Sequence, residues 1–316
     1  MKFKLETKIP AFTQKISHQD QVIFFGSCFS DDISSRFKNA GFDVLSNPFG
    51  TIFHPIPMAR NIINSFNQGS ELSIFESENH FSSWDCSTLI NSESKDVLEQ
   101  EIRKIQATFL EYIEKSSYLF ITFGTSFGYL NTENEQIVSN CHKQNSTLFR
   151  KKLSEIEEMS HLWKTALEVI FEKNPQIKIV FTVSPVRHSK DGLTENNRSK
   201  ARLFELISNL EKHFKNKNAL HYFPSYEIII DELRDYRFYK EDLIHPSEQA
   251  INYIWEKIKT TFFSEKTIKL IDEVENLRKL EQHKILTKNQ VEIDKFNELK
   301  KLKIKKFLEE NNTVKF

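Results

Sequence analysis

The chain has 316 residues, of which 39% are hydrophobic and 12% aromatic, enough to bury one large core or two small ones. Lys plus Arg and Asp plus Glu both number 44, so the formal net charge is zero and the charge balance predicts neither a nucleic-acid nor a membrane partner. Because the first twenty residues hold no apolar run of signal-peptide length and no later stretch could span a bilayer, we expect a folded cytoplasmic protein.

Short runs rich in β-branched and aromatic residues predict buried strands at 21–25, 118–123, 177–183 and 219–223. Apolar residues that recur three or four apart predict helices over 96–116, 148–171, 199–214 and 247–263. Strands that alternate with helices of this length form βαβ units. The fold class is therefore α/β, a three-layer α/β/α sandwich with a parallel sheet, and the chemistry is expected at the carboxyl ends of the strands.

From about residue 264 the composition changes to Lys, Glu, Leu and Ile, with no Gly or Pro up to residue 316. This change divides the chain into a body, 1–263, and a charged helical extension, 264–316. Leu270, Val274 and Leu277 form an apolar stripe, but the repeat fails at Glu281 and Lys284. We expect a helix or helical hairpin packed on the body, with self-association through these C-terminal helices as the alternative.

The segment 26–30, GSCFS, follows the first predicted strand and precedes a helical pattern. Gly26 allows a tight reversal, and the residues after it lie at a helix N-terminus, where free N–H groups favour an anion. If Ser27 or Cys28 is a nucleophile, these N–H groups would stabilise both its deprotonated form and the oxyanion of the reaction. The alternative is that Ser27 is only an N-cap.

The segment 242–247, DLIHPS, lies just before the last body helix. Asp242, three residues before His245 on a non-helical turn, can accept the Nδ1–H bond and leave Nε2 free as a general base. Asp–His pairs are common by chance, but one that follows a strand-turn nucleophile is far more specific. The two segments together predict a catalytic nucleophile–His–Asp constellation.

The segments GSCFS (26–30), NPFGTIF (47–53), SPVRH (184–188) and DLIHPS (242–247) resemble those of the GSCFA-domain proteins, a bacterial family in the SGNH-hydrolase superfamily. The resemblance covers the body of the chain and omits the extension. It implies a flavodoxin-like SGNH-hydrolase fold that needs no metal. It also implies a site in which successive blocks supply the nucleophile, a glycine N–H, an Asn side chain and the D-x-x-H pair.

The D-x-x-H pair matches the last block, and Gly50 matches the second as a backbone donor, with a turn glycine as the alternative. The third block departs from the pattern, because the superfamily would have Gly-x-Asn where this chain reads GTS at 124–126. We therefore name Ser126 and Asn140 as candidate oxyanion donors.

The superfamily pattern implies that the nucleophile is the second residue after the glycine, which is Cys28 rather than Ser27. One residue along a helix turns a side chain by about 100°, so both cannot face His245 equally. We favour Cys28 and expect the helix N-terminus and His245 to lower the pKa of its thiol. A structural thiol is the alternative.

Arg187 follows the third predicted strand and could bind a substrate carboxylate or phosphate, with a salt bridge as the alternative. The cysteines, Cys28, Cys86 and Cys141, lie far apart without a CxxC pair, as expected for reduced thiols. His142 lies beside Cys141, but no further Cys or His follows at the spacing of zinc ligands, so we expect no metal site and no cofactor.

These features favour an esterase or deacylase that acts on a carbohydrate or small-molecule acyl ester. An acyltransferase with a thioester donor such as acetyl-coenzyme A is the first alternative, because a thiolate suits thioester exchange, although the sequence has no recognisable phosphate-binding loop. A non-catalytic binding module, with the extension as its partner surface, is the second.

Overall fold

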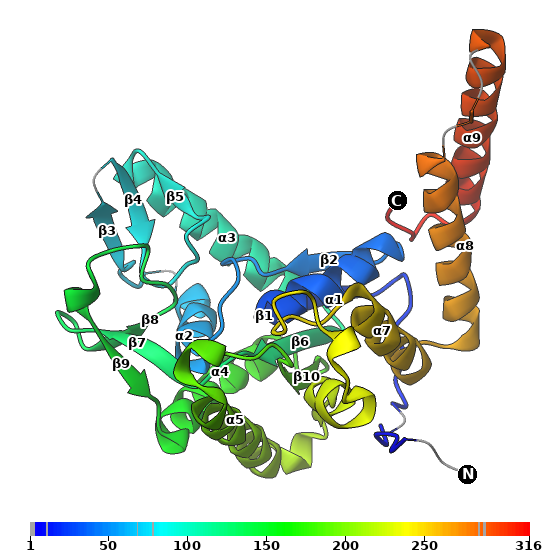
Figure 1. The fold of residues 1–316 in the computed structure, drawn as a ribbon. Coiled ribbons are helices and arrows are strands. Elements are labelled where there is room, and N and C mark those ends of the chain that lie inside the picture. Colours follow the sequence, from blue (N-terminus) through cyan, green and yellow to red (C-terminus); the bar gives the residue numbers. More distant parts are fainter. Residues whose placement is uncertain (1–3, 11, 68, 78, 284, 287–288) are drawn as a thin grey trace.

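The computed structural model describes residues 4–10, 12–67, 69–77, 79–283, 285–286 and 289–316. Within these residues the centre of the fold is a five-stranded parallel sheet in the order β11-β10-β6-β1-β2 (Figure 1). Its strands are β1 (Gln21–Gly26), β2 (Asp43–Ser46), β6 (Tyr118–Phe123), β10 (Lys178–Val183) and β11 (Leu220–Tyr222). Counted along the chain, this is the flavodoxin-like order 2-1-3-4-5, whose switch point lies between β1 and β6. The predicted fold class is confirmed.

The sheet strands are apolar on both faces because helices cover both. On β1, Ile23 and Phe25 join the core that contains α2 (Pro55–Phe66), α3 (Lys95–Lys115), α4 (Ile156–Lys173) and α5 (Leu193–His213). The alternate residues Val22 and Phe24 join the opposite core, which contains α1 (Cys28–Asn39) and α7 (Glu248–Phe262). Side chains two apart on a strand share a face, so the apolar run at 21–25 builds both cores at once.

Two small antiparallel sheets form a lobe beside the parallel sheet (Figure 1). They consist of β3 (Ile74–Ser77), β4 (His80–Ser83) and β5 (Asn91–Ser92), and of β7 (Phe127–Asn131), β8 (Gln136–Val138) and β9 (Phe149–Leu153). The helix predicted over 148–171 is wrong at its start, because Phe149–Leu153 pairs with β7 and α4 begins at Ile156. Pairing with a distant strand overrode the local helical spacing.

The remaining elements are short and lie mostly between β10 and α7. They are the 3-10 turns Ser146–Leu148, Ser189–Asp191, Lys215–Lys217 and Tyr236–Phe238, the helical turn α6 (Ser225–Glu227), and the π-helical segment Ile228–Leu233 that continues it. The helices predicted over 96–116 and 247–263 are confirmed as α3 and α7, whereas α5 begins at Leu193, ahead of the predicted 199. None of the helices in the described part of the chain is long and apolar enough to cross a membrane.

The extension forms α8 (Glu265–Gln282) and α9 (Gln290–Glu310), which run side by side away from the body (Figure 1). The base of α8 belongs to the body, since Ile271 is fully buried in the core of α1 and α7. Residues near the C-terminus also contact the body at the end of α1, where the N–H of Lys315 donates to the carbonyl of Gly41 at 2.8 Å. The hydrophobic core therefore continues past residue 264. Lys284, where the apolar repeat fails, lies outside the described residues.

Ile271→Ala should lower the free energy of unfolding by roughly 2–4 kcal/mol, because it opens a cavity in the core shared by the body and α8. Leu299→Ala, a control on α9 where the side chain is 57% exposed, should change it by less than about 0.5 kcal/mol. Urea unfolding followed by circular dichroism measures both. Equal effects of the two substitutions would mean that α8 does not share the body's core.

Candidate active site

The turn between β1 and α1 is shaped by the contact of Gly26 with the neighbouring strand. Gly26 has φ +149°, and a Cβ atom there would lie 2.2 Å from the carbonyl oxygen of Thr122 on β6. The next N–H, that of Ser27, donates to the same oxygen at 3.1 Å. A side chain at position 26 would push the two strands apart, so the turn requires glycine. It places Cys28 as the first residue of α1.

Ser27 and Cys28 differ in exposure. Ser27 occupies the N-cap position of α1, but its hydroxyl makes no capping bond, and among the described residues it has no hydrogen-bond partner. Its side chain is buried, whereas that of Cys28 is half-buried. The side chain accessible at the start of the helix is the thiol.

Asp31 fastens the segment 47–53 to the first turn of α1. Its carboxylate accepts hydrogen bonds from Asn47 Nδ2 at 2.7 Å and from the hydroxyl of Thr51 at 2.9 Å. The side-chain oxygen of Asn47 in turn accepts the N–H of Gly26 at 2.7 Å. Residues from two of the sequence motifs thus form one clamp that holds the β1–α1 turn.

Gly50 does not have the free N–H that a backbone oxyanion donor needs. Its N–H donates to the carbonyl of Asn47 at 2.8 Å, its φ is +75°, and a Cβ atom there would lie 1.9 Å from Ser87 Oγ. This is the turn glycine that the sequence left as the alternative. The prediction of Gly50 as an oxyanion donor is therefore wrong.

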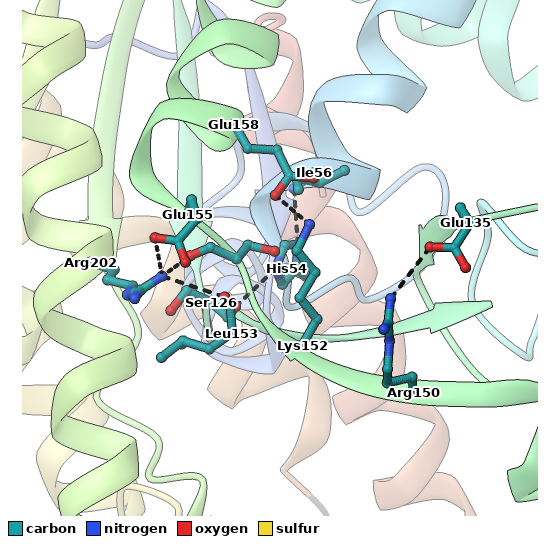
Figure 2. Close-up of polar contacts among 11 residues, drawn as sticks. His54, Ile56, Ser126, Glu135, Arg150, Lys152, Leu153, Glu155, Glu158 and Arg202 are labelled. Carbon is teal, nitrogen blue, oxygen red and sulfur yellow. Dashed lines mark hydrogen bonds and ion pairs between the residues drawn. The ribbon is translucent and has the colours of Figure 1, made fainter. Parts of the chain in front are cut away.

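Ser126 is also unavailable as an oxyanion donor, because it is fully buried and bound to α5. Its hydroxyl donates to the carbonyl of Ser199 at 3.0 Å, and its N–H donates to the Ser199 hydroxyl at 2.8 Å. Its carbonyl accepts from Nε2 of the buried His54 at 3.1 Å, whose Nδ1 accepts the N–H of Ile56 at the start of α2 (Figure 2). Ser126 therefore joins α2 to α5.

The segment that joins β9 to α4 also binds α5. Arg202 donates to the carbonyl of Ser154 at 2.5 Å and pairs with Glu155 at 3.0 Å, while Lys152 pairs with Glu158 (Figure 2). These contacts hold the small-sheet lobe against the helices of the parallel sheet.

Asn140 lies in the small-sheet lobe, after β8, and not at the carboxyl ends of the parallel strands. Its side-chain oxygen accepts the N–H of His142 at 2.8 Å and so closes a local turn. This bond engages the side-chain oxygen and not the amide N–H groups, so Asn140 as an oxyanion donor stays a prediction.

Asp242 and His245 form the contact that their spacing predicts. His245 Nδ1 lies 2.7 Å from Asp242 Oδ2, while Asp242 Oδ1 accepts the N–H groups of Ile244 and His245, both at 2.9 Å. These backbone bonds, with the imidazole, lower the pKa of Asp242 to about 2. Leu243, with φ +58°, makes the turn that permits them. The carboxylate stays ionised and fixes the ring with Nε2 facing away from it.

The Asp242–His245 loop is held beside α1. The carbonyl of His245 accepts the N–H of Lys240 at 2.7 Å, and Ser247 caps α7, which packs on α1 through the ion pair of Glu248 with Arg36. Ile244, between Asp242 and His245, packs against the hydrophobic core of α1 and α7, as Cys28 does. The pair therefore lies on the same side of the sheet as the thiol.

The thiol of Cys28 ionises less readily than the sequence predicts. Burial raises its pKa, and the carboxylates of Asp32 and Asp31 raise it further, although the N–H groups of Phe29 and of Cys28 itself lower it. The predicted lowering of this pKa is wrong, because the two carboxylates on α1 and desolvation outweigh the helix N-terminus.

Arg187 stands at the end of β10 and faces the Asp242–His245 loop. Its guanidinium lies 5.1 Å from the centre of the Tyr239 ring, and Tyr239 pairs with Pro246, the residue after His245. Among the described residues no carboxylate lies within ion-pair distance of Arg187, so the salt-bridge alternative does not hold there. Beside it, burial and the charge of Lys200 lower the pKa of His188 to about 4.

Lys200 is a buried charged residue that sequence reasoning missed. It is 1% exposed, and its Nζ donates to the carbonyl oxygens of Gly124 and Ser184, each at 2.6 Å. Burial lowers its pKa to about 7. The signal was its position three residues before Leu203, on the apolar stripe of the predicted helix, where a lysine is out of place.

A family model for the GSCFA family matches residues 21–258, and the chain belongs to this family. No curated protein matches the sequence. Similar solved structures include a candidate acylhydrolase from Bacteroides fragilis, with 8% identity over 79% of this chain and 91% of that one (TM-score 0.38). An acetyl xylan esterase from Butyrivibrio proteoclasticus is 10% identical over 85% and 66% (TM-score 0.37). The periplasmic domain of a lipopolysaccharide acetyltransferase from Salmonella ser. Paratyphi A is 9% identical over 78% and 83% (TM-score 0.36).

Lys200 should give stability a measurable pH dependence. Its pKa is about 7 when folded against an ordinary 10.5, so between these values the unfolded chain binds more protons than the folded one. The contribution of this lysine to the free energy of unfolding therefore rises with pH across that window, and its cost is greatest below pH 7. Lys200→Met should remove this rise.

Urea unfolding of the wild type and of Lys200→Met at pH 7 and pH 9.5 measures the effect. The variant should be more stable relative to the wild type at pH 7 than at pH 9.5. A difference between the two proteins that is the same at both pH values would contradict a lowered lysine pKa.

Proposed function

We propose that this GSCFA-family protein is an SGNH-type hydrolase that cleaves acyl esters. Cys28 is the proposed nucleophile, His245 the general base, and Asp242 the residue that orients the imidazole. The observation that carries the proposal is the 2.7 Å hydrogen bond between His245 and Asp242, in a loop whose Ile244 packs against the same core as Cys28. The exposure of the thiol relative to the Ser27 hydroxyl favours Cys28 over Ser27.

The proposed reaction uses His245 twice. With Nδ1 bound to Asp242, Nε2 accepts the thiol proton as the sulfur of Cys28 attacks the ester carbonyl carbon. The tetrahedral oxyanion collapses and breaks the bond to the alcohol, which leaves with the proton from Nε2. Water then attacks the thioester, gives a proton to Nε2, and the acid leaves as the sulfur recovers that proton.

The raised pKa of the thiol makes the base important in this scheme. A thiol that stays protonated in the free protein needs a proton acceptor during attack, so His245 cannot be dispensable. For the oxyanion, the N–H groups of Cys28 and Phe29 at the N-terminus of α1 are the proposed donors in place of Gly50 and Ser126.

The proposed substrate is a carbohydrate or small-molecule acyl ester. Arg187, with no carboxylate partner in the described part of the chain, is the residue we propose to contact a substrate carboxylate or phosphate. Acyl transfer from a thioester such as acetyl-coenzyme A would use the same residues and the same acyl-cysteine, so an assay has to separate the two reactions.

A panel of p-nitrophenyl esters, with and without acetyl-coenzyme A, tests the proposal. The wild type should hydrolyse short acyl esters, and Cys28→Ala and His245→Ala should each lower kcat/KM by at least about a thousandfold. Ser27→Ala should keep most of the activity. Cys141→Ala, which removes a half-buried thiol from the small-sheet lobe, is the matched control and should keep all of it.

The pattern of variants separates the alternatives. Loss of activity in Ser27→Ala but not in Cys28→Ala would make Ser27 the nucleophile, and full activity in both would refute the constellation. Consumption of acetyl-coenzyme A with transfer to the alcohol would indicate an acyltransferase. No turnover of any ester or thioester by a folded wild type would favour the binding module.

Alkylation tests the nucleophile without a substrate. Iodoacetamide at pH 8 should label Cys28 faster than Cys86 or Cys141, because burial raises the pKa of those thiols to about 12 and about 11. Peptide mass spectrometry resolves the three sites. A good ester substrate added in excess should slow labelling of Cys28 alone, and faster labelling of Cys141 would argue against the proposed nucleophile.

A further inference from the structure

Helix α9 leaves its apolar side chains uncovered in the single chain. It carries eight of them among its 21 residues, yet none of its residues, all of which the structure describes, is buried. Leu299 and Leu302 are 57% and 64% exposed, and Val291 is 74% exposed. Most of the stability of a helix in a protein comes from packing of its apolar face. A further surface is therefore needed to cover α9.

Helix α8 covers only one side of α9. Lys300 Nζ donates to the carbonyls of Glu281 and His283, at the end of α8, at 2.7 and 3.1 Å. Val291 and Leu302 are turned by about 160–180° from Lys300, at 100° per residue, and so lie on the side away from α8. The two helices project beyond the body, which leaves this side of α9 accessible (Figure 1).

A groove lies beside this exposed side, between α9 and the end of α8. Its lining combines two apolar side chains with four charged ones: Ile304, Leu308, Glu281, Lys301, Lys305 and Glu309. The same helix thus carries protruding apolar side chains and an apolar recess. An interface between two identical chains about a two-fold axis needs both on one surface, because each copy has to supply what the other receives.

The charges of α9 are separated along its length. Residues 292–298, the acidic run, hold three carboxylates and one lysine, whereas residues 300–306, the lysine run, hold five lysines and no carboxylate. The helix dipole does not explain this order, because it favours cations in the last turn, where the chain has Glu309 and Glu310. Two parallel copies of α9 would place lysine run against lysine run. Antiparallel copies place each lysine run against an acidic run.

We propose that α9 is the contact surface between two copies of this chain, which pack as antiparallel helical hairpins about a two-fold axis. When the acidic run of each copy faces the lysine run of the other, the axis passes through Leu299. In that register Val291 of one copy lies opposite Phe307 of the other, between Ile304 and Leu308 in the groove. The charges set the register independently of the groove, and they bring a protruding valine to it.

Sedimentation equilibrium of the full chain tests the proposal. The wild type should form a dimer that dissociates on dilution. Leu299→Asp places two carboxylates together at the axis and should raise the dimer dissociation constant at least about tenfold. A wild type that stays monomeric at every concentration would overturn the proposal, and so would an unchanged dissociation constant in Leu299→Asp. A monomer that instead sediments with vesicles of anionic lipid would make the lysine run a membrane contact.

Leu89→Asp is the matched control. Leu89 is 85% exposed and lies in the small-sheet lobe, so the same chemical change there should leave the dissociation constant as in the wild type. An equal effect of the two substitutions would mean that the dimer does not use α9. Because α9 lies outside the core of the body, Leu299→Ala remains the neutral control for urea unfolding at chain concentrations well below the dissociation constant.

Cysteine cross-linking tests the direction of the two helices. Leu299→Cys should form a disulfide between two copies, because position 299 of each copy meets its equivalent at the axis. Val291→Cys should not, because the two equivalents of position 291 are about 24 Å apart in an antiparallel pair, beyond the reach of a disulfide. Peptide mass spectrometry distinguishes these bonds from any formed by the native thiols.

The cross-links also decide between the two arrangements. A disulfide that forms as readily in Val291→Cys as in Leu299→Cys would indicate parallel helices and overturn the antiparallel pair. Neither experiment uses a substrate or a residue of the candidate active site, so failure of the proposed hydrolase activity and failure of this interface are separate results.

Discussion

The contact between Gly26 and the carbonyl of Thr122 fixes the geometry on which the candidate site depends. Since no side chain fits there, β1 and β6 stay at parallel-sheet spacing until β1 ends, and the chain turns directly into a helix. Ser27 and Cys28 are then the only residues between strand and helix interior. The hydrogen bonds of Asn47 with Asp31 and with the N–H of Gly26 hold the same turn from the β2 side.

The chemistry of that thiol follows from a balance of charges. The helix N-terminus favours an anion, but α1 also places Asp31 and Asp32 within its first turns, and these raise the thiol pKa. A cysteine in this setting depends on a base from elsewhere in the chain. In the proposed reaction that base is His245, from the loop before α7, whose Ile244 packs against the same core as Cys28.

The sequence predicted the features that depend on local patterns. Apolar runs identified four of the five parallel strands, and the D-x-x-H spacing predicted the contact of Asp242 with His245. The misses have a common physical origin in long-range pairing. Strand β2 is short and half-buried, so it lacks the apolar run that marks a buried strand. Residues 149–153 have helical apolar spacing, and their pairing with β7, about twenty residues earlier in the chain, is not visible in the local sequence. The small-sheet lobe also has few strongly apolar strands.

The oxyanion donors failed for a different reason, which is that hydrogen bonds are exclusive. Gly50 and Ser126 are residue types that can donate, but their donors are already bound by Asn47 and Ser199, and no sequence pattern reports that. Lys200 is the converse case. A lysine on an apolar stripe is visible in the sequence, yet only the fold reveals that its amine binds the carbonyls of Gly124 and Ser184, which follow the neighbouring strands β6 and β10.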